Sequence, residues 1–198
     1  MQPDQYLIFF IISWIATGFV LIISLFAFQR RSSPGATTFG LLMLLVALWT
    51  FSIAMGMISQ KPSVAFVWAV FRLIGVSLVP VFWFTFAFQF AERETRIDLR
   101  LISLASIMPA ISIVLMATSH YHDLFLIDIQ YIRSGPFLID VLWELGPLFY
   151  VHIAYSYLLI LAGMFILLRE ALLISRGYRE QAILLISGVF IPLLTNFA

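Results

Sequence analysis

The chain of 198 residues contains no cysteine, little charge and only three histidines. Without cysteine, disulfides, thiolate nucleophiles and cysteine-based metal sites are excluded. Asp, Glu, Lys and Arg make up 11% of the residues, compared with about 25% in soluble domains. The net charge is +1 and no basic stripe is present, so a nucleic-acid partner is not predicted. The sequence also lacks a glycine-rich phosphate loop, a nucleophile elbow and an HExxH motif.

Hydrophobic residues dominate the rest of the sequence. They make up 63% of the chain and occur in long runs separated by short charged clusters, which indicates an integral membrane protein. A membrane-spanning helix needs about 20 predominantly apolar residues. Six runs are candidates, at about 6–28, 38–59, 64–91, 101–119, 147–168 and 180–198.

These runs predict an all-α, polytopic transmembrane helix bundle. In lipid every backbone amide must be bonded within the protein, which favours helices over strands here. Pro80, Pro109 and Pro192 fall inside the runs and are tolerated where neighbouring groups satisfy the freed carbonyls. The first run is not predicted to be a signal peptide, because residues 1–5 contain Asp4 and no Lys or Arg.

The positions of the arginines predict the orientation. Eight of them follow the first, third and fifth runs and fall on one side: Arg30, Arg31, Arg93, Arg96, Arg100, Arg169, Arg176 and Arg179. The other side carries only Lys61 and Arg133. The positive-inside rule makes the arginine-rich side cytoplasmic and the N-terminus external. The protein is therefore predicted to be a multi-pass protein of the cell membrane, surrounded by the lipid bilayer.

One long external loop is predicted at about 120–146. It is rich in Ile, Leu, Phe and Tyr, so we expect it to pack over the mouth of the bundle, either as part of a ligand site or as a tether. The sixth run leads outward to Ala198. A seventh helix is therefore expected beyond this position, leading back to the cytoplasm.

Several short motifs follow one another along the chain. They are Arg31–Ala36 (RSSPGA), Leu48-Trp49, Leu78–Trp83 (LVPVFW), Thr118–Phe125 (TSHYHDLF), Gly146–Tyr157 (GPLFYVHIAYSY) and Tyr178–Gln181 (YREQ). In this order they resemble the N-terminal seven-transmembrane sensor region of bacterial and archaeal histidine kinases, a region also attached to cyclic-dinucleotide synthases. The departure from that pattern is the end, where a seventh helix and a kinase are missing.

The resemblance implies a single transmembrane sensor domain over residues 1–198. In such a family, the region binds a small-molecule or lipidic signal and biases a cytoplasmic output domain in cis, here a histidine kinase of a two-component system. The membrane would be the inner or plasma membrane of a bacterium or archaeon. The resemblance supplies no ligand and no cofactor, and it leaves homodimer formation open.

Arg72 and Glu144 are predicted to lie at the outer boundary of the membrane. Counting back about 20 residues from Glu92 places Arg72 at that depth. There its side chain can either anchor the helix by reaching water or phosphate, or contact an anionic ligand at a pocket mouth. In the ligand-free state we expect Arg72 to pair with Glu144.

His152 and Tyr155 belong to a polar face of the fifth run. The residues of this face follow a spacing of 4, 4, 3 and 4: Glu144, Leu148, His152, Tyr155 and Leu159. Ionisable groups at this depth face the bundle interior, so His152 either bonds a neighbouring helix or binds the signal. Tyr155 is a better pocket candidate than Tyr157, which cannot share this face. Trp83, three residues after Pro80, is expected to line the kink in the third run.

His120 and His122 lie where the fourth run leaves the membrane. Together with His152 they could in principle hold a metal ion, but an i, i+2 spacing does not suit a helix face and no carboxylate is placed to orient the rings. No metal site is therefore predicted. We expect the two residues to fix the loop, and a pH-sensing role stays open because histidine titrates near neutrality.

The sequence bears on three classes of function: enzyme, transporter or channel, and sensor. All three histidines fall on the external half, away from cytoplasmic ATP, so the chain itself is predicted to hold no kinase chemistry. A transporter typically has a polar midplane with interrupted helices in repeated halves, whereas the polar groups here cluster in the outer half and the inner half looks plain. We therefore predict a membrane sensor that regulates a cytoplasmic output domain, with a small-molecule transporter or channel subunit as the alternative.

Overall fold

The computed structural model describes residues 3–92 and 98–173. The elements are the helices α1 (Pro3–Gln29), α2 (Ala36–Met57), α3 (Pro62–Glu92), α4 (Leu99–Ala105) and α5 (Ile107–Ala117), a 3₁₀ turn η1 (Ser119–Tyr121), the strands β1 (Leu126–Ser134) and β2 (Phe137–Leu145), and α6 (Pro147–Leu173). Within these residues α1, α2, α3 and α6 are each long and apolar enough to cross a bilayer, and α4 with α5 makes a fifth, bent candidate. The predicted helical bundle is confirmed; the run 180–198 lies outside the described residues.

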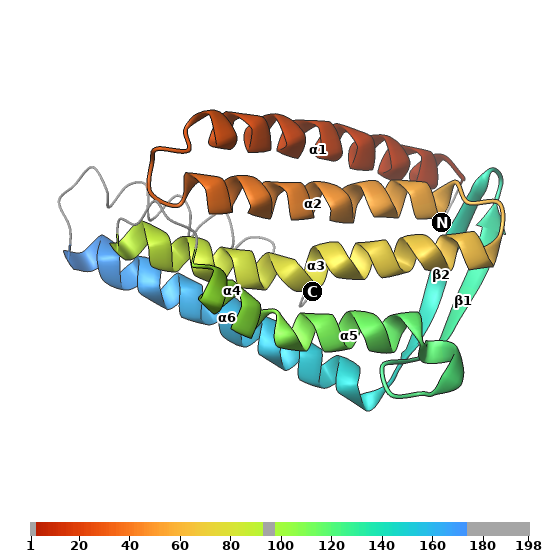
Figure 1. The fold of residues 1–198 in the computed structure, drawn as a ribbon. Helices are drawn as coiled ribbons and strands as arrows, with labels where there is room; N and C mark the ends of the chain where they lie inside the picture. Colours follow the sequence, from red (N-terminus) through yellow and green to blue (C-terminus); the bar gives the residue numbers. More distant parts are fainter. Residues whose placement is uncertain (1–2, 93–97, 174–198) are drawn as a thin grey trace.

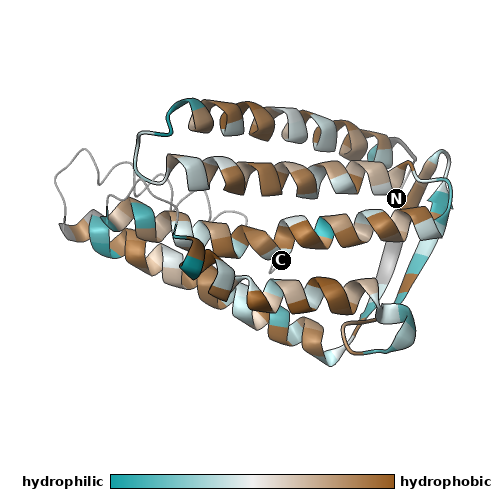
Figure 2. Cartoon of the chain, in the orientation of Figure 1, coloured by the Kyte–Doolittle hydropathy of each residue, from teal (hydrophilic) through white to brown (hydrophobic). Residues whose placement is uncertain are grey.

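The helices pack in a simple order (Figure 1). α2 packs against α1 and α3, and α3 packs against α6, with α5 beside both α3 and α6. Apolar residues run along the helix shafts, and the more polar segments lie at the two ends and on the hairpin (Figure 2). The predicted cytoplasmic end holds the turn between α1 and α2 and the start of α4, and the hairpin lies at the other end.

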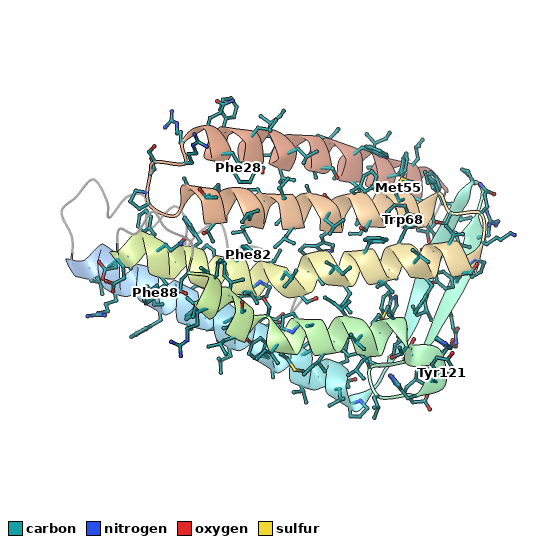
Figure 3. The ribbon with its side chains drawn as sticks, in the orientation of Figure 1. Phe28, Met55, Trp68, Phe82, Phe88 and Tyr121 are labelled. Carbon is teal, nitrogen blue, oxygen red and sulfur yellow. The ribbon has the colours of Figure 1, made fainter. Side chains whose placement is uncertain are left out.

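Small and hydroxylated residues let α1, α2 and α3 approach closely. A Cβ at Gly75 of α3 would lie 2.9 Å from the Leu45 carbonyl oxygen of α2, so the two backbones nearly touch there. Gly40 of α2 leaves room for the ring of Phe28 from α1 (Figure 3). In α1, the Ser24 hydroxyl donates to the Gly40 carbonyl over 2.9 Å. Such contacts replace the hydrophobic driving force that helices lack inside a membrane.

A buried polar pair joins α2 to α3 near the predicted cytoplasmic end. The Thr38 hydroxyl donates to the Oε1 atom of Gln89 over 2.5 Å, and the two residues are 0% and 2% exposed. The prediction of a plain inner half is therefore wrong. The reason is that a single threonine or glutamine hardly lowers the mean hydropathy of so long an apolar run, and the bond between them across the two helices satisfies both groups.

The fourth span is broken into α4 and α5 by a bend of 43°. Pro109 has no N–H, so in a continuous helix the carbonyl of Ala105, four residues earlier, would lack its donor. The Tyr155 hydroxyl of α6 donates to this Ala105 oxygen over 2.7 Å. A neighbouring helix thus satisfies the carbonyl that proline releases, as expected for a membrane helix.

The predicted loop 120–146 is largely a β-hairpin, which the sequence interpretation did not foresee. Strands β1 and β2 pair antiparallel, and Ser134 pairs with Phe137 around a two-residue turn. Gly135 has φ +59° and Pro136 follows with its φ fixed near −65°, the pattern of a type II′ turn. Ser-Gly-Pro between two runs rich in Ile, Leu and aromatic residues was the available signal.

Candidate functional site

The hairpin covers the end of the bundle that is predicted to be external (Figure 1). Phe137 at its tip packs against Phe10 of α1, with ring centroids 5.7 Å apart. The Arg133 guanidinium donates to the Gln60 carbonyl, between α2 and α3, over 2.7 Å. Phe137 and Leu138 are both buried. These contacts confirm that the segment packs over the bundle mouth.

Arg72 of α3 faces the hairpin. Its Cζ atom lies 4.7 Å from the ring centroid of Trp143 on β2, a cation–π contact that contributes about 0.5–2 kcal/mol, depending on desolvation. Neighbouring side chains on a strand point to opposite faces, so the adjacent Glu144 points away from Arg72. Glu144 is exposed and its Cα is paired with that of Asp128 across the hairpin. The predicted Arg72–Glu144 pair is therefore wrong.

Glu144 also does not share a helix face with His152. The helix α6 begins at Pro147, after Gly146 has ended the strand, so the spacing argument from Glu144 onward fails at this boundary. The argument fails because α6 follows β2 after a single residue. The sequence is apolar throughout this junction, which hides the change in side-chain periodicity from two residues in the strand to 3.6 in the helix.

A small cavity lies beside Arg72 between α2, α3 and the hairpin. Its volume is about 30 Å³, and its lining includes Ser52, Gly56, Ala69, Tyr131 and Leu138. This volume can hold a water molecule, which needs about 10–15 Å³. It is far below the roughly 300 Å³ of the smallest usual ligand pockets. An organic ligand can therefore bind here only if the residues that line the cavity rearrange.

Phe125 connects the base of the hairpin to the interior of the bundle. It lies directly before β1 and is 1% exposed. Its ring centroid is 5.3 Å from that of Phe149 and 6.0 Å from that of His152, both on α6. A displacement of the base of the hairpin must therefore disturb the packing around His152.

Gly146 joins the hairpin to α6. Its N–H donates to the Phe125 carbonyl over 3.0 Å, and the Leu148 N–H donates to the Leu124 carbonyl over 2.9 Å. A Cβ at position 146 would overlap the backbone of Asp123 and Leu124. Glycine is required for this close approach, and the result is that the hairpin base and the first turn of α6 are held together by backbone bonds.

His152 is 5% exposed and bonds a neighbouring helix. Its Nδ1 atom lies 3.0 Å from the Ser112 hydroxyl of α5, and its Nε2 atom lies 3.5 Å from the Ser156 hydroxyl. The single proton of the Ser112 hydroxyl is donated to the Met108 carbonyl over 2.9 Å. Since a hydroxyl has one proton, we assign the bond to Ser112 as donated by Nδ1–H of His152.

Trp83 joins α3 to α6 deeper in the bundle. Its Nε1–H donates to the Ile160 carbonyl over 3.1 Å, and the ring is 4% exposed among core residues that include Phe86 and Leu167. Gly163 leaves the space for this ring, because a Cβ there would lie 2.6 Å from Nε1. Trp83 is thus packed between two helices.

His120 and His122 have different surroundings. The Nε2 atom of His122 lies 3.0 Å from the Thr118 hydroxyl, and its Nδ1 accepts from the Leu124 N–H over 3.4 Å, so this ring braces the loop before β1. His120 is exposed, and its ring contacts that of Tyr121 at an interplanar angle of 45°, with centroids 3.8 Å apart; Tyr121 projects from η1 (Figure 3). In the described ranges, no group of three or more His, Asp or Glu is placed to hold a metal ion.

The predicted site residues are spread along the bundle and do not surround one pocket. Arg72 faces the hairpin, His152 contacts α5, Tyr155 contacts α4, and Trp83 contacts α6 from α3. The cavity beside Arg72 is not lined by the other three or by Glu144. Along α6, the structure instead forms a series of contacts, first with the hairpin base and then with α5, α4 and α3.

Sequence reasoning missed several partners in this series. Trp143, Phe125 and Ser112 were not among the predicted site residues. The partner of Tyr155 could have been found, since Pro109 frees the carbonyl of the residue four positions earlier. Nothing in the sequence indicated that Ser112 lies beside His152, because that contact depends on how α5 is rotated against α6.

Comparison with known proteins yields one family. Residues 9–198 match the model of the N-terminal 7TM region of histidine kinases. No curated protein matches, and no solved structure matches. The match spans nearly the whole chain and agrees with the several apolar helices of the fold. The chain therefore belongs to the family of N-terminal seven-transmembrane regions of histidine kinases, and it is a multi-pass membrane sensor module.

Proposed function

We propose that this region detects an external or membrane-borne signal at the hairpin and passes it through α6 to a histidine kinase domain on the cytoplasmic side. The observation that carries the proposal is the continuity of contacts from the hairpin into α6. Phe125 packs on His152, and the backbone bonds at Gly146 fix the hairpin to the first turn of the helix.

The described conformation corresponds to a closed state of such a sensor. The cavity beside Arg72 holds no more than water, so a ligand that needs this site binds only after the hairpin has moved. A ligand shifts a two-state equilibrium only by the difference in its affinities for the two states. A signal that binds beneath the hairpin would therefore favour the open state by replacing the stacking of Arg72 on Trp143.

Movement of the hairpin would reach the other helices through α6. Tilting or sliding α6 would strain its bonds to Ser112 of α5, to Ala105 of α4 and to Trp83 of α3. Of these three contacts, the hydrogen bond to Ala105 lies where the fourth span is already bent between α4 and α5. We propose that this bend absorbs the movement, because packed cores otherwise rearrange between discrete states and do not deform smoothly.

The test uses the full-length protein in membranes and reads the activity of its output domain. Ser112→Ala and His152→Gln both disrupt the contact between α5 and α6, and we expect them to change basal output in the same direction. Thr50→Val removes a hydroxyl from the contact between α1 and α2 and serves as the control. Insertion and thermal stability are measured on the same samples.

Three outcomes can be separated. A shift of output in the two α6-contact variants with normal insertion supports the proposal. Parental output in all three variants contradicts it. Failure of the two variants to insert or fold would show that His152 has a purely structural role, which also contradicts a signalling role for this contact.

A further inference from the structure

A groove of about 450 Å³ opens at the predicted cytoplasmic end, between α1, α2 and α3. The turn between α1 and α2, which supplies part of its lining, lies at the end opposite the hairpin (Figure 1), and the proposed signalling contacts do not use the groove. Its volume is within the range of about 300–1,000 Å³ that ligand sites occupy. Its lining has two parts. Arg30 and Ser33 form a polar mouth, and an aromatic wall is formed by Phe26, Phe39, Phe86 and Phe90.

The polar mouth attracts anions. Arg30 is exposed and carries a full positive charge next to the groove. The helix α2 begins at Ala36 and its N-cap residue, Gly35, makes no side-chain capping bond, so the partial positive charge of this helix end adds to that of Arg30. The Ser33 hydroxyl supplies a further donor at the same place.

The turn that carries these groups rests directly on the aromatic wall. Gly35 has φ +70°, and a Cβ there would lie 2.9 Å from the Phe86 ring. The Phe86 ring in turn packs against Phe39 and Phe90, with centroids 5.3 and 6.0 Å away. The turn between α1 and α2 is therefore packed against the aromatic wall at Gly35.

We propose that this groove binds an anionic phospholipid of the cytoplasmic leaflet, with the phosphate at Arg30 and one acyl chain along the phenylalanine wall. Three observations favour this occupant. The groove lies at the arginine-rich end of the bundle, where the positive-inside rule places the cytoplasmic headgroups. Its charge is complementary to a phosphate, and its polar mouth lies next to its apolar wall, as a headgroup lies next to its acyl chains. Basic pockets between helices on this side are typical headgroup sites.

The test is lipid retention by the purified protein in detergent, measured by native mass spectrometry. The probes are palmitoyl-oleoyl phosphatidylglycerol and the matched phosphatidylcholine. We expect the parent to retain the anionic lipid preferentially, and Arg30→Gln to reduce its retention about five-fold, which corresponds to about 1 kcal/mol per arginine. Arg100→Gln is the matched control, because Arg100 is exposed at the same end but does not line the groove.

Two results would overturn the headgroup assignment. One is equal retention of the two lipids by the parent protein. The other is an equal loss in the Arg30 and Arg100 variants, which would indicate general surface charge. A further variant tests the acyl part: Ala27→Leu adds volume to the groove wall and should reduce retention of both lipids.

The competing occupant is the chain's own segment 180–198. The absence of native cysteine permits a clean cross-linking test with Ala27→Cys and single cysteines placed along that segment. Efficient cross-linking from position 27 in lipid-depleted protein, with lipid retention unaffected by Ala27→Leu, would assign the groove to the chain itself and overturn the proposal.

Discussion

The helices α1 and α6 are both 27 residues long and both are candidate membrane spans, yet their surroundings differ. Most large apolar side chains of α1 are exposed, and its described helix contacts are made mainly with α2. By contrast, α6 bonds or packs against α3, α4, α5 and the base of the hairpin. Length and hydropathy identify a span, but the cross-helix contacts decide whether the span can transmit a movement.

The largest difference in thermal stability is expected between alanine substitutions of one glycine in each of these helices. A Cβ at Gly163 of α6 would lie 2.6 Å from the Trp83 indole nitrogen, so Gly163→Ala must displace the ring and break its bond to Ile160. Overpacking of this kind costs about 1–3 kcal/mol. We expect a clear fall in the thermal unfolding midpoint of the detergent-purified protein.

Gly18→Ala in α1 is the matched control. No atom lies within 4 Å of a Cβ at this position, and alanine favours the helix by up to about 1 kcal/mol relative to glycine. We expect an unchanged or higher midpoint. An equal fall of the midpoint in both alanine variants would contradict the claim that α6 is packed more tightly than α1 at these glycines.

A smaller effect is expected at the bend of the fourth span. Tyr155→Phe leaves the Ala105 carbonyl without the hydroxyl donor, at a cost of about 1–2 kcal/mol. Pro109→Ala restores an N–H that can reach the same carbonyl. In the Pro109→Ala variant, Tyr155→Phe should therefore lower the free energy of unfolding much less. A double-mutant cycle on unfolding free energies measures this coupling, and strictly additive effects would contradict the account of the bend.

The smallest effect is expected between α1 and α2. The hydroxyls of Thr17 and Thr50 lie 2.8 Å apart, and interhelical hydrogen bonds in membranes contribute about 0.6 kcal/mol on average. Thr17→Val keeps the shape and removes the hydroxyl, so we expect a small loss of stability and no change in output activity. A change in output as large as that of His152→Gln would show that α1 also transmits the signal.

The spans could be predicted from sequence because their cause is local. The prediction 38–59 became Ala36–Met57, and 147–168 became Pro147–Leu173, since bilayer thickness sets the length of each apolar run. The hairpin was missed because its strands are as apolar as the spans, and only the turn at Gly135 marked it.

The contacts of the site were harder to predict than the spans. These helices carry apolar residues on every face, so their hydropathy does not show which face packs against which neighbouring helix. His152 was predicted to be an interior residue because ionisable groups at this depth in the membrane face the bundle interior. Its partner Ser112 could not be found, since a serine in an apolar helix usually bonds its own backbone, as Ser112 also does.

The central claim is that the hairpin controls α6 and that α1 does not take part. Basal output activity of the full-length protein, compared between Trp143→Ala and Phe28→Ala, tests it most directly. Trp143 stacks on Arg72, whereas Phe28 of α1 packs at Gly40 of α2, at the end of the bundle away from the hairpin (Figure 3). The account predicts a two- to thirty-fold change for Trp143→Ala, from the roughly 0.5–2 kcal/mol of the lost contact, and parental activity for Phe28→Ala. Parental activity in both variants, with both inserted and stable, would contradict it.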